Sequence, residues 1–428
     1  MKKIIYLLGF SFFCLQSVLA QQVTSEANIS RIINTLASDE MKGRSALGGE
    51  IWKAADFIGA EFKEIGLKPL ESEDFKQHFE VNLQKSFNQS VIIGDKELSS
   101  EEFLILGNIN DPKHNDVFLS ISADEDFSTR FREIVQKDTN EVSVRVDKKH
   151  AALLARFKKI YSRDKITAKG EKPSSTKQKV FYIAEEGERP SKVTCGNTSM
   201  DIKMFNVAGV IPGKSKPNEF VIFSAHYDHI GILEAVDQDS IANGADDDAS
   251  GTTAMIELAR YYKKLNNNER TLIFVAFTAE ELGMFGSKFF SSKINPESVV
   301  AMINIEMIGK DSKFGTNSLY ITGYDASDLG KLMQENLKGS KFKFHPDPYK
   351  TQNLFYRSDN ATLAALGVPA HTFSTSQIDK DQYYHTVDDE VSTLDIKNIK
   401  YSIEAIAKGA TGIVNGKQTP KRVEKLRD

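Results

Sequence analysis

The strongest constraint on the fold is a series of short apolar runs in the second half of the chain. The runs are rich in Val, Ile and Phe and lie at 207–211, 220–224, 271–277, 299–305, 318–322 and 369–373. Between several of them, apolar residues recur with the period of an α-helix, as at Met255, Leu258 and Tyr262. Strands that are buried on both faces and alternate with helices predict an α/β fold. We therefore expect three layers, with an open, mostly parallel sheet and helices on both of its faces.

The sequence pattern changes along the chain and indicates four regions. Residues 1–20 are set apart by an apolar stretch, and residues 21–74 contain two amphipathic helical stretches. From 75 to 203, short alternating runs are separated by Lys-rich polar stretches, which predicts a small mixed α/β domain inserted into the main one. Residues 204–428 carry the strand and helix pattern of the main domain.

The first twenty residues predict an export signal. Lys2 and Lys3 precede an apolar stretch, and the small residues Val18 and Ala20 mark a cleavage site. We expect the signal peptide to be removed near Ala20 and the protein to be periplasmic or secreted. A membrane anchor is the alternative, but it would need about 20 apolar residues. No later stretch reaches that length, so we expect no stable membrane insertion.

Charge and cysteine content limit the possible chemistry. The 55 Lys and Arg against 59 Asp and Glu give a net charge of −4, which does not favour nucleic acid as a partner. Of the two cysteines, Cys14 lies within the predicted signal, so Cys195 would remain alone. One cysteine supports neither a disulfide scaffold nor a thiolate zinc cluster. Any metal site is therefore expected to consist of His, Asp and Glu.

Acidic and imidazole residues follow the apolar runs or lie in nearby loops, where an open α/β sheet presents its ligand crevice. In chain order they are His226, Asp228, the run Asp246-Asp247-Asp248, the pair Glu280-Glu281, Glu306 and His385. Each also fits a structural role: a His-x-Asp pair can be simply hydrogen-bonded, and consecutive aspartates can open and cap a helix. Two zinc ions that share an activated water require five protein ligands and a base. The set contains two imidazoles, three carboxylates and a spare Glu that could fill these places, with Asp228 in addition.

Four motifs resemble the co-catalytic zinc exopeptidases, family twenty-eight of the metallopeptidases. They are His-Tyr-Asp at 226–228, the aspartate run within 244–251, Thr-Ala-Glu-Glu-Leu-Gly at 278–283 and Tyr-His-Thr at 384–386. The family includes bacterial leucyl aminopeptidases, aminopeptidase Y, glutamate carboxypeptidase and the glutaminyl cyclases. The resemblance covers about 29–69 and 205–414, and it leaves the inserted region outside.

The resemblance implies two zinc ions per chain. His226 would bind one ion and His385 the other, with Asp247 bridging them and Glu281 as a further ligand. Glu306 stands where the family usually carries Asp, so the fifth ligand would have an extra methylene, which can shift one ion or favour another divalent metal. His229 and His371 lie near strand ends close to the site, but the resemblance leaves no ligand position for them.

The resemblance also implies how the site would work. Glu280 matches the general base that takes a proton from the bridging water and returns it to the leaving amine. Asp228 matches the carboxylate that orients the ring of His226. A second departure places Asn360 where relatives often carry His. The expected substrate is a peptide, and the expected reaction is the release of its amino-terminal residue by an exported aminopeptidase.

Three other functions remain open from the sequence. A carboxypeptidase of the glutamate carboxypeptidase type would need a cation to clamp the substrate carboxylate, and Arg357 is one candidate. A glutaminyl cyclase-like aminoacyltransferase would use a single zinc on the same scaffold. The last is a non-catalytic binding protein with the same fold. The oligomeric state is not indicated.

Overall fold

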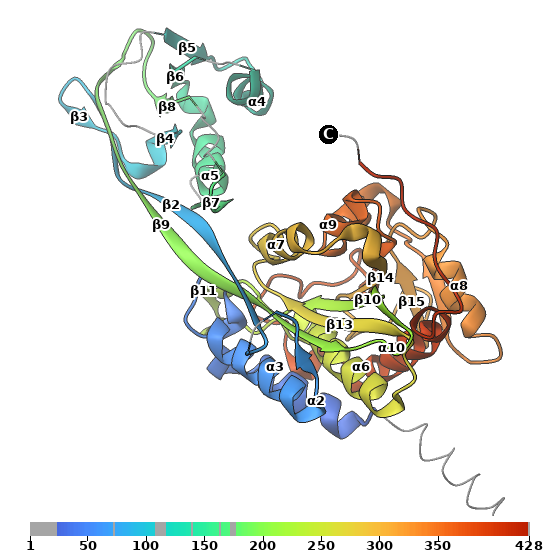
Figure 1. The fold of residues 1–428 in the computed structure, drawn as a ribbon. Coiled ribbons are helices and arrows are strands. Elements are labelled where there is room, and N and C mark those ends of the chain that lie inside the picture. Colours follow the sequence, from blue (N-terminus) through green and yellow to red (C-terminus); the bar gives the residue numbers. More distant parts are fainter. Residues whose placement is uncertain are drawn as a thin grey trace, which may run out of the picture. The chain divides into compact units, whose positions relative to one another are not determined.

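The computed structural model describes residues 24–71, 73–107, 117–137, 140–161, 164–171 and 177–426 (Figure 1). The predicted signal peptide, residues 1–20, lies outside the described residues. The described chain forms two compact units. The first unit contains the chain up to Phe79 and from Met204 onward, and the second unit is Glu80–Lys203.

The first unit is built on a sheet whose central strands are parallel. Its strands are β1 (Lys68–Pro69), the end of β9 (Pro190–Ile211), β10 (Lys216–His226), β13 (Arg270–Phe277), β14 (Val299–Ile305), β15 (Ser318–Ile321), β16 (Lys343–Pro346) and β17 (Ala370–Ser374). β10 pairs in parallel with both β13 and β14, and β17 extends the parallel set beyond β14. β9 joins β13 and β15 joins β17 in antiparallel fashion. The predicted mostly parallel sheet is confirmed.

Helices cover both faces of this sheet (Figure 1). They are α2 (Glu26–Leu36), α3 (Ile51–Ile65), α6 (Gly251–Leu265), α7 (Phe285–Lys293), α8 (Leu329–Asn336), α9 (Asn360–Ala365), α10 (Ile396–Gly409) and α11 (Thr411–Val414). Successive strand residues point to opposite faces. Phe223 therefore joins the core with α2, α3, α6 and α10, whereas Ile222 joins the core with α7 and α9. This arrangement is the expected three-layer fold.

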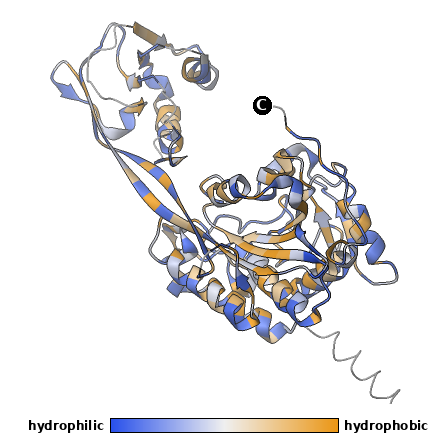
Figure 2. Cartoon of the chain, in the orientation of Figure 1, coloured by the Kyte–Doolittle hydropathy of each residue, from blue (hydrophilic) through white to orange (hydrophobic). Residues whose placement is uncertain are grey.

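The strands that lie between the helix layers carry mostly apolar runs. All eight residues of β13 are buried, and six of them, from Leu272 to Phe277, are apolar. The central strands are largely orange in Figure 2. A strand that is covered on both faces cannot alternate apolar with polar residues without burying the polar ones. This is why the runs at 271–277 and 299–305 could be recognised as strands.

The second unit contains a small mixed sheet with two helices. Its strands β4 (Phe103–Leu106), β8 (Lys179–Ile183), β6 (Val142–Val146) and β5 (Val117–Ile121) lie in that order, beside α4 (Phe127–Lys137) and α5 (Ala151–Tyr161). Phe127, Phe131 and Phe181 lie in its core. The strands β3 (Lys96–Glu97) and β7 (Lys165–Ala168) pair with β2 (Lys76–Ile93).

One strand of the chain differs from the expectation. Two of the short alternating runs expected between 75 and 203 lie at 79–83 and 90–93, and both are part of the continuous strand β2, which is 18 residues long. The residues between them are polar apart from Phe87, but β2 has β9 as its neighbour along the sheet, and the backbone hydrogen bonds of a strand pair do not require apolar side chains. Among the described helices, none combines the length and apolar character needed to cross a membrane.

Candidate metal centre

The predicted site residues gather at the edge of the sheet where the parallel strands end. His226 is the last residue of β10, and Glu306 directly follows β14. Glu280 and Glu281 lie in the turn between β13 and α7, and His385 lies in the loop that follows β17. Because parallel strands present their carboxyl ends at the same edge, residues far apart in the chain converge there.

Asp247 reaches this edge from an irregular segment before α6. The segment η4 (Ala245–Ser250) has non-helical backbone angles at Asp247, with φ −105° and ψ 95°. The regular helix begins only at Gly251. The expectation that the aspartate run itself opens the helix is therefore wrong in detail, because the run forms a bent segment in front of it.

The two flanking aspartates hold this segment in place through backbone groups. Asp246 Oδ1 accepts the N–H of Gly309 at 2.7 Å, and Asp248 Oδ1 accepts the N–H of Met307 at 3.1 Å. Asp248 Oδ1 also accepts the N–H of Gly251 at 3.1 Å, which is a helix-capping contact. Of the three aspartates, Asp247 is the one whose carboxylate faces the histidines.

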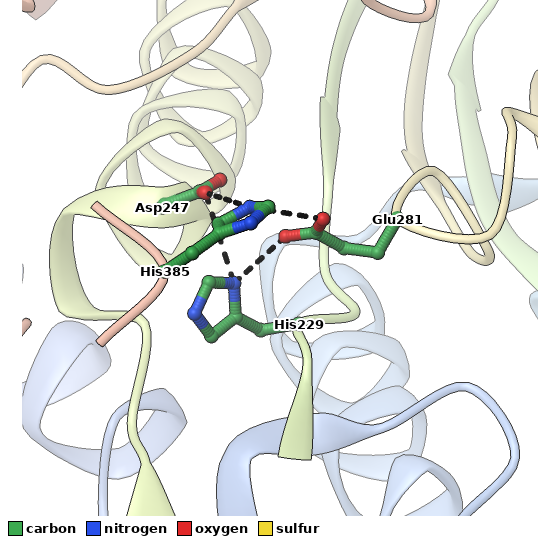
Figure 3. Close-up of side chains that lie close together, drawn as sticks. All are labelled: His229, Asp247, Glu281 and His385. Carbon is green, nitrogen blue, oxygen red and sulfur yellow. Dashed lines mark hydrogen bonds and ion pairs between the residues drawn. The ribbon is translucent and has the colours of Figure 1, made fainter. Parts of the chain in front are cut away.

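Asp247 belongs to two groups of possible ligands. One group is His226, Asp247 and Glu306, and the other is His229, Asp247, Glu281 and His385. Within each group, the ligand atoms lie within 4.8 Å of one another. The two oxygens of Asp247 face different rings. Oδ1 is 3.2 Å from Nε2 of His226. Oδ2 is 3.3 Å from Nε2 of His385, the contact drawn in Figure 3. A carboxylate that bridges two cations requires this placement.

The donor atoms are suited to divalent cations. Nε2 of His226, Nε2 of His385 and Oε2 of Glu306 are buried without a hydrogen-bond partner among the described residues. Carboxylate oxygens lie only 3.1–3.3 Å from the two nitrogens. Polar atoms left in this state are costly, and imidazole nitrogens with carboxylate oxygens are the ligands that zinc takes in hydrolytic sites. The residues therefore fit a pair of such ions.

The charge of the cluster supports the same conclusion. Burial lowers the pKa of His385, but the carboxylates of Asp247 and Glu281 outweigh it and raise that pKa to about 10. Burial also lowers the pKa of His226, but Asp247 and the neighbouring carboxylates outweigh it and raise that pKa well above 6.5. Burial raises the pKa of Glu306 to about 7. A cluster with this excess of negative charge attracts protons or, equally, metal cations.

The carboxylate of Asp228 binds the turn that carries Glu280 and Glu281, and not the ring of His226. Its carboxylate accepts the backbone N–H groups of Glu280 at 3.2 Å and of Glu281 at 3.4 Å. Nδ1 of His226 lies 3.9 Å from that carboxylate but 3.0 Å from the backbone oxygen of Asp228. The group of Asp228 beside the ring is therefore its backbone carbonyl, and not the carboxylate that the resemblance implied. Burial raises the pKa of the Asp228 carboxyl to about 7.

His229 was not expected in either group, and the structure corrects this. Its Nδ1 lies 2.9 Å from Oε1 of Glu281 and 3.8 Å from Oδ2 of Asp247 (Figure 3). The one signal in the sequence is its position three residues after His226 in the same loop. His371 is bound instead by Ser327, whose Oγ is 2.7 Å from Nε2, and by the carbonyl of Thr322 at 2.8 Å.

Two buried charges support the loops that carry the site, and neither was expected. The guanidinium of Arg44 donates to four carbonyl oxygens, those of Leu36, Tyr227, Asn243 and Gly244, at 2.6–2.8 Å. Asp389 accepts the backbone N–H of Asp246 at 3.0 Å and of Asp247 at 3.0 Å. These contacts join residues up to 200 positions apart, so no local pattern reveals them.

A cavity of about 410 Å³ opens beside the cluster. Glu306 and Tyr384 line it on the side of the metal centre, and Arg357, Tyr349 and Ile378 also contribute to its wall. Asn360 is not among the lining residues. Its amide is buried and donates to the carbonyls of Phe355 and Ala370, so it has a structural role.

The chain is similar to known proteins in sequence and in fold. Residues 206–410 match the family model of peptidase family M28. A probable zinc metalloprotease of Leptosphaeria maculans is 31% identical over 113 residues, which are 26% of each chain. Aminopeptidase YwaD of Bacillus subtilis is 23% identical over 228 residues, 51% of this chain and 47% of that one. The chain thus spans from about a quarter to about half of these relatives. The aminopeptidase from Aneurinibacillus sp. strain AM-1 has a similar fold, with a TM-score of 0.57 at 19% identity, covering 95% of this chain and 96% of that one.

Proposed function

Since residues 206–410 form a domain of peptidase family M28, we propose that this chain is a zinc-dependent aminopeptidase that releases amino-terminal residues from peptides. The observation that carries the proposal is Asp247, whose two oxygens face the histidines of two separate donor groups. His226 and Glu306 would complete one cation position, and Glu281 and His385 the other. When bound, the two cations would supply a water of lowered pKa and polarise the scissile carbonyl.

Glu280 is proposed as the general base. It belongs to neither donor group, yet its backbone is fixed next to Glu281 by the carboxylate of Asp228. A carboxylate held beside the cations without ligating them is free to accept a proton from water. It would then return that proton to the nitrogen of the leaving amine as the peptide bond breaks. This division explains why two adjacent glutamates are needed.

The cavity beside Glu306 is proposed to hold the substrate next to the cations. Its wall carries Tyr320, Tyr349 and Ile378, which offer apolar surface. Arg357 also lines it, and this one observation keeps a carboxypeptidase as the second candidate, because a guanidinium can bind a terminal carboxylate through two parallel hydrogen bonds. The names of the relatives favour the aminopeptidase.

A panel of blocked peptides separates the two candidates. The purified protein is stripped with a chelator, reloaded with zinc and incubated with three forms of one peptide. The first form has both ends free, the second has an acetylated amino end, and the third has a free amino end and an amidated carboxyl end. Mass spectrometry identifies the released residue. We expect both peptides with a free amino end to lose that residue and the acetylated one to remain intact. Release of carboxyl-terminal residues, including from the acetylated peptide, would contradict the proposal.

Export is proposed as well, on the basis of the amino-terminal sequence. Fractionation of the producing cells, followed by sequencing of the amino end, checks this. A protein that begins near Gln21 and is found outside the cytoplasmic fraction is the expected result. A full-length protein in the cytoplasm would contradict it.

A further inference from the structure

His229 occupies a position that the five-ligand arrangement does not explain. Its side chain is completely buried, and its Nδ1 points at the space between Glu281 and His385 (Figure 3). The rings of His229 and His385 lie edge to face, with centroids 5.6 Å apart. On the basis of the proposed two-zinc function, we propose that His229 is a fourth protein ligand in the group of Asp247, Glu281 and His385.

The ring of His229 is held in this direction by its surroundings. A Cβ atom on Gly244 would lie 2.5 Å from Cδ2 of His229, so the ring packs directly on the backbone of Gly244. The backbone N–H of His229 donates to the carbonyl of Arg44 at 3.2 Å. A ring fixed from both sides keeps Nδ1 towards the carboxylates without further loss of side-chain entropy when a cation binds.

The proposal makes the two cation positions unequal. The first group offers three side chains, and the second offers four. Three protein ligands leave a zinc with an open position for water or substrate, whereas a fourth protein ligand holds the ion more firmly and makes a shared water its fifth ligand. The position at Asp247, Glu281, His385 and His229 is therefore the tighter one and fills first. The position at His226 and Glu306 remains open, on the side where Glu306 lines the cavity.

X-ray absorption at the zinc edge tests this on the unaltered protein. Protein loaded with one zinc per chain should show two imidazole nitrogens on the metal, from His229 and His385. One imidazole per zinc would overturn the inference. If such a protein still cleaves the peptide panel, the proposed function stands and only the role of His229 fails. A protein that binds no zinc would overturn both.

The zinc affinity of two variants distinguishes a ligand from a residue that only positions Glu281. Gln in place of His229 can still donate a hydrogen bond to Glu281 but has no ring nitrogen for the cation. We expect His229→Gln to weaken binding of the first zinc by about 10- to 100-fold in competition with a chelator, at least as much as losing an outer hydrogen-bond partner costs. His78→Gln, at an exposed residue outside both groups, should bind both ions like the wild type. Unchanged affinity in a folded His229→Gln protein would mean that His229 only holds Glu281. The absorption measurement decides the question even if that variant fails to fold.

Discussion

Oδ2 of Asp389 accepts the backbone N–H of Asp247 at 3.0 Å, so the residue placed between the two donor groups is fixed by a carboxylate 142 positions away. The same carboxylate accepts the N–H of Asp246 with both of its oxygens, at 3.0 and 3.1 Å. The carbonyl of Asp389 also accepts the N–H of Ala245 at 3.0 Å. Asp389 thus satisfies the first three backbone donors of the bent segment, those of Ala245, Asp246 and Asp247.

Replacing Asp389 with Asn tests this support. One amide oxygen cannot accept both N–H groups as the carboxylate does, and the new NH₂ group faces backbone donors. We expect the free energy of unfolding to fall by about 1–3 kcal/mol, together with weaker zinc retention. Denaturant titration and metal analysis measure both effects. Asp388→Asn, at the exposed neighbouring residue, is the matched control and should change neither.

Glu280→Gln should separate chemistry from metal binding. The amide cannot accept the proton, so turnover should fall by about 10²- to 10⁴-fold. Zinc content should remain at the wild-type value, because Glu280 is in neither donor group. Peptide hydrolysis and metal analysis on the same sample check the two halves. Near-normal turnover would remove Glu280 from the role of base.

Glu306 can be shortened or neutralised to test its role as a ligand. Glu306→Asp keeps a carboxylate at the end of β14, and we expect it to retain or improve metal binding. Glu306→Gln removes the charge and should lower zinc content towards one ion per chain, because the group of His226, Asp247 and Glu306 loses one of its two carboxylates. Loss of both metal and folded structure in Glu306→Asp would instead indicate a structural role.

His371 should make stability depend on pH. Burial lowers its pKa to about 4, while an unfolded histidine titrates near 6.5. Between these values the unfolded chain binds a proton that the native ring does not, so this contribution is complete above about pH 6.5 and is lost as the pH falls towards 4. The loss amounts to about 3 kcal/mol. In denaturant titrations, the stability advantage of wild type over His371→Gln should shrink by that amount from pH 7 to pH 4, whereas a constant difference would argue against it.

The layered fold could be predicted because its strands carry a local signal. The run at 299–305 coincides with β14, and the run at 271–277 is β13 without its first residue. A strand between two helix layers is mostly apolar, so its own residues identify it. Strand β2 could not be predicted as one element, since its middle is mostly polar and its continuity depends on the neighbouring β9.

In the site, too, the residues marked by the local sequence could be predicted, whereas those whose role depends on contacts distant in sequence could not. The histidines and acids that follow the strands could be found from their positions. The roles of His229 and Asp389 depend on which residues lie opposite them after folding, and neither lies in a periodic pattern. The bend at Asp247 was missed for a different reason: three aspartates before a helix are also the pattern of an ordinary helix start.

Arg44 and Asp389 lie near opposite ends of the described chain, and both form hydrogen bonds with the backbone of the same short stretch, 243–247. The same stretch therefore depends on residues from both the beginning and the end of the described chain. A chain that ends before His385 would lack that donor and also the carboxylate that accepts the amides of Asp246 and Asp247. We expect such a chain to lose the cation sites even where the sheet and the Arg44 contacts remain.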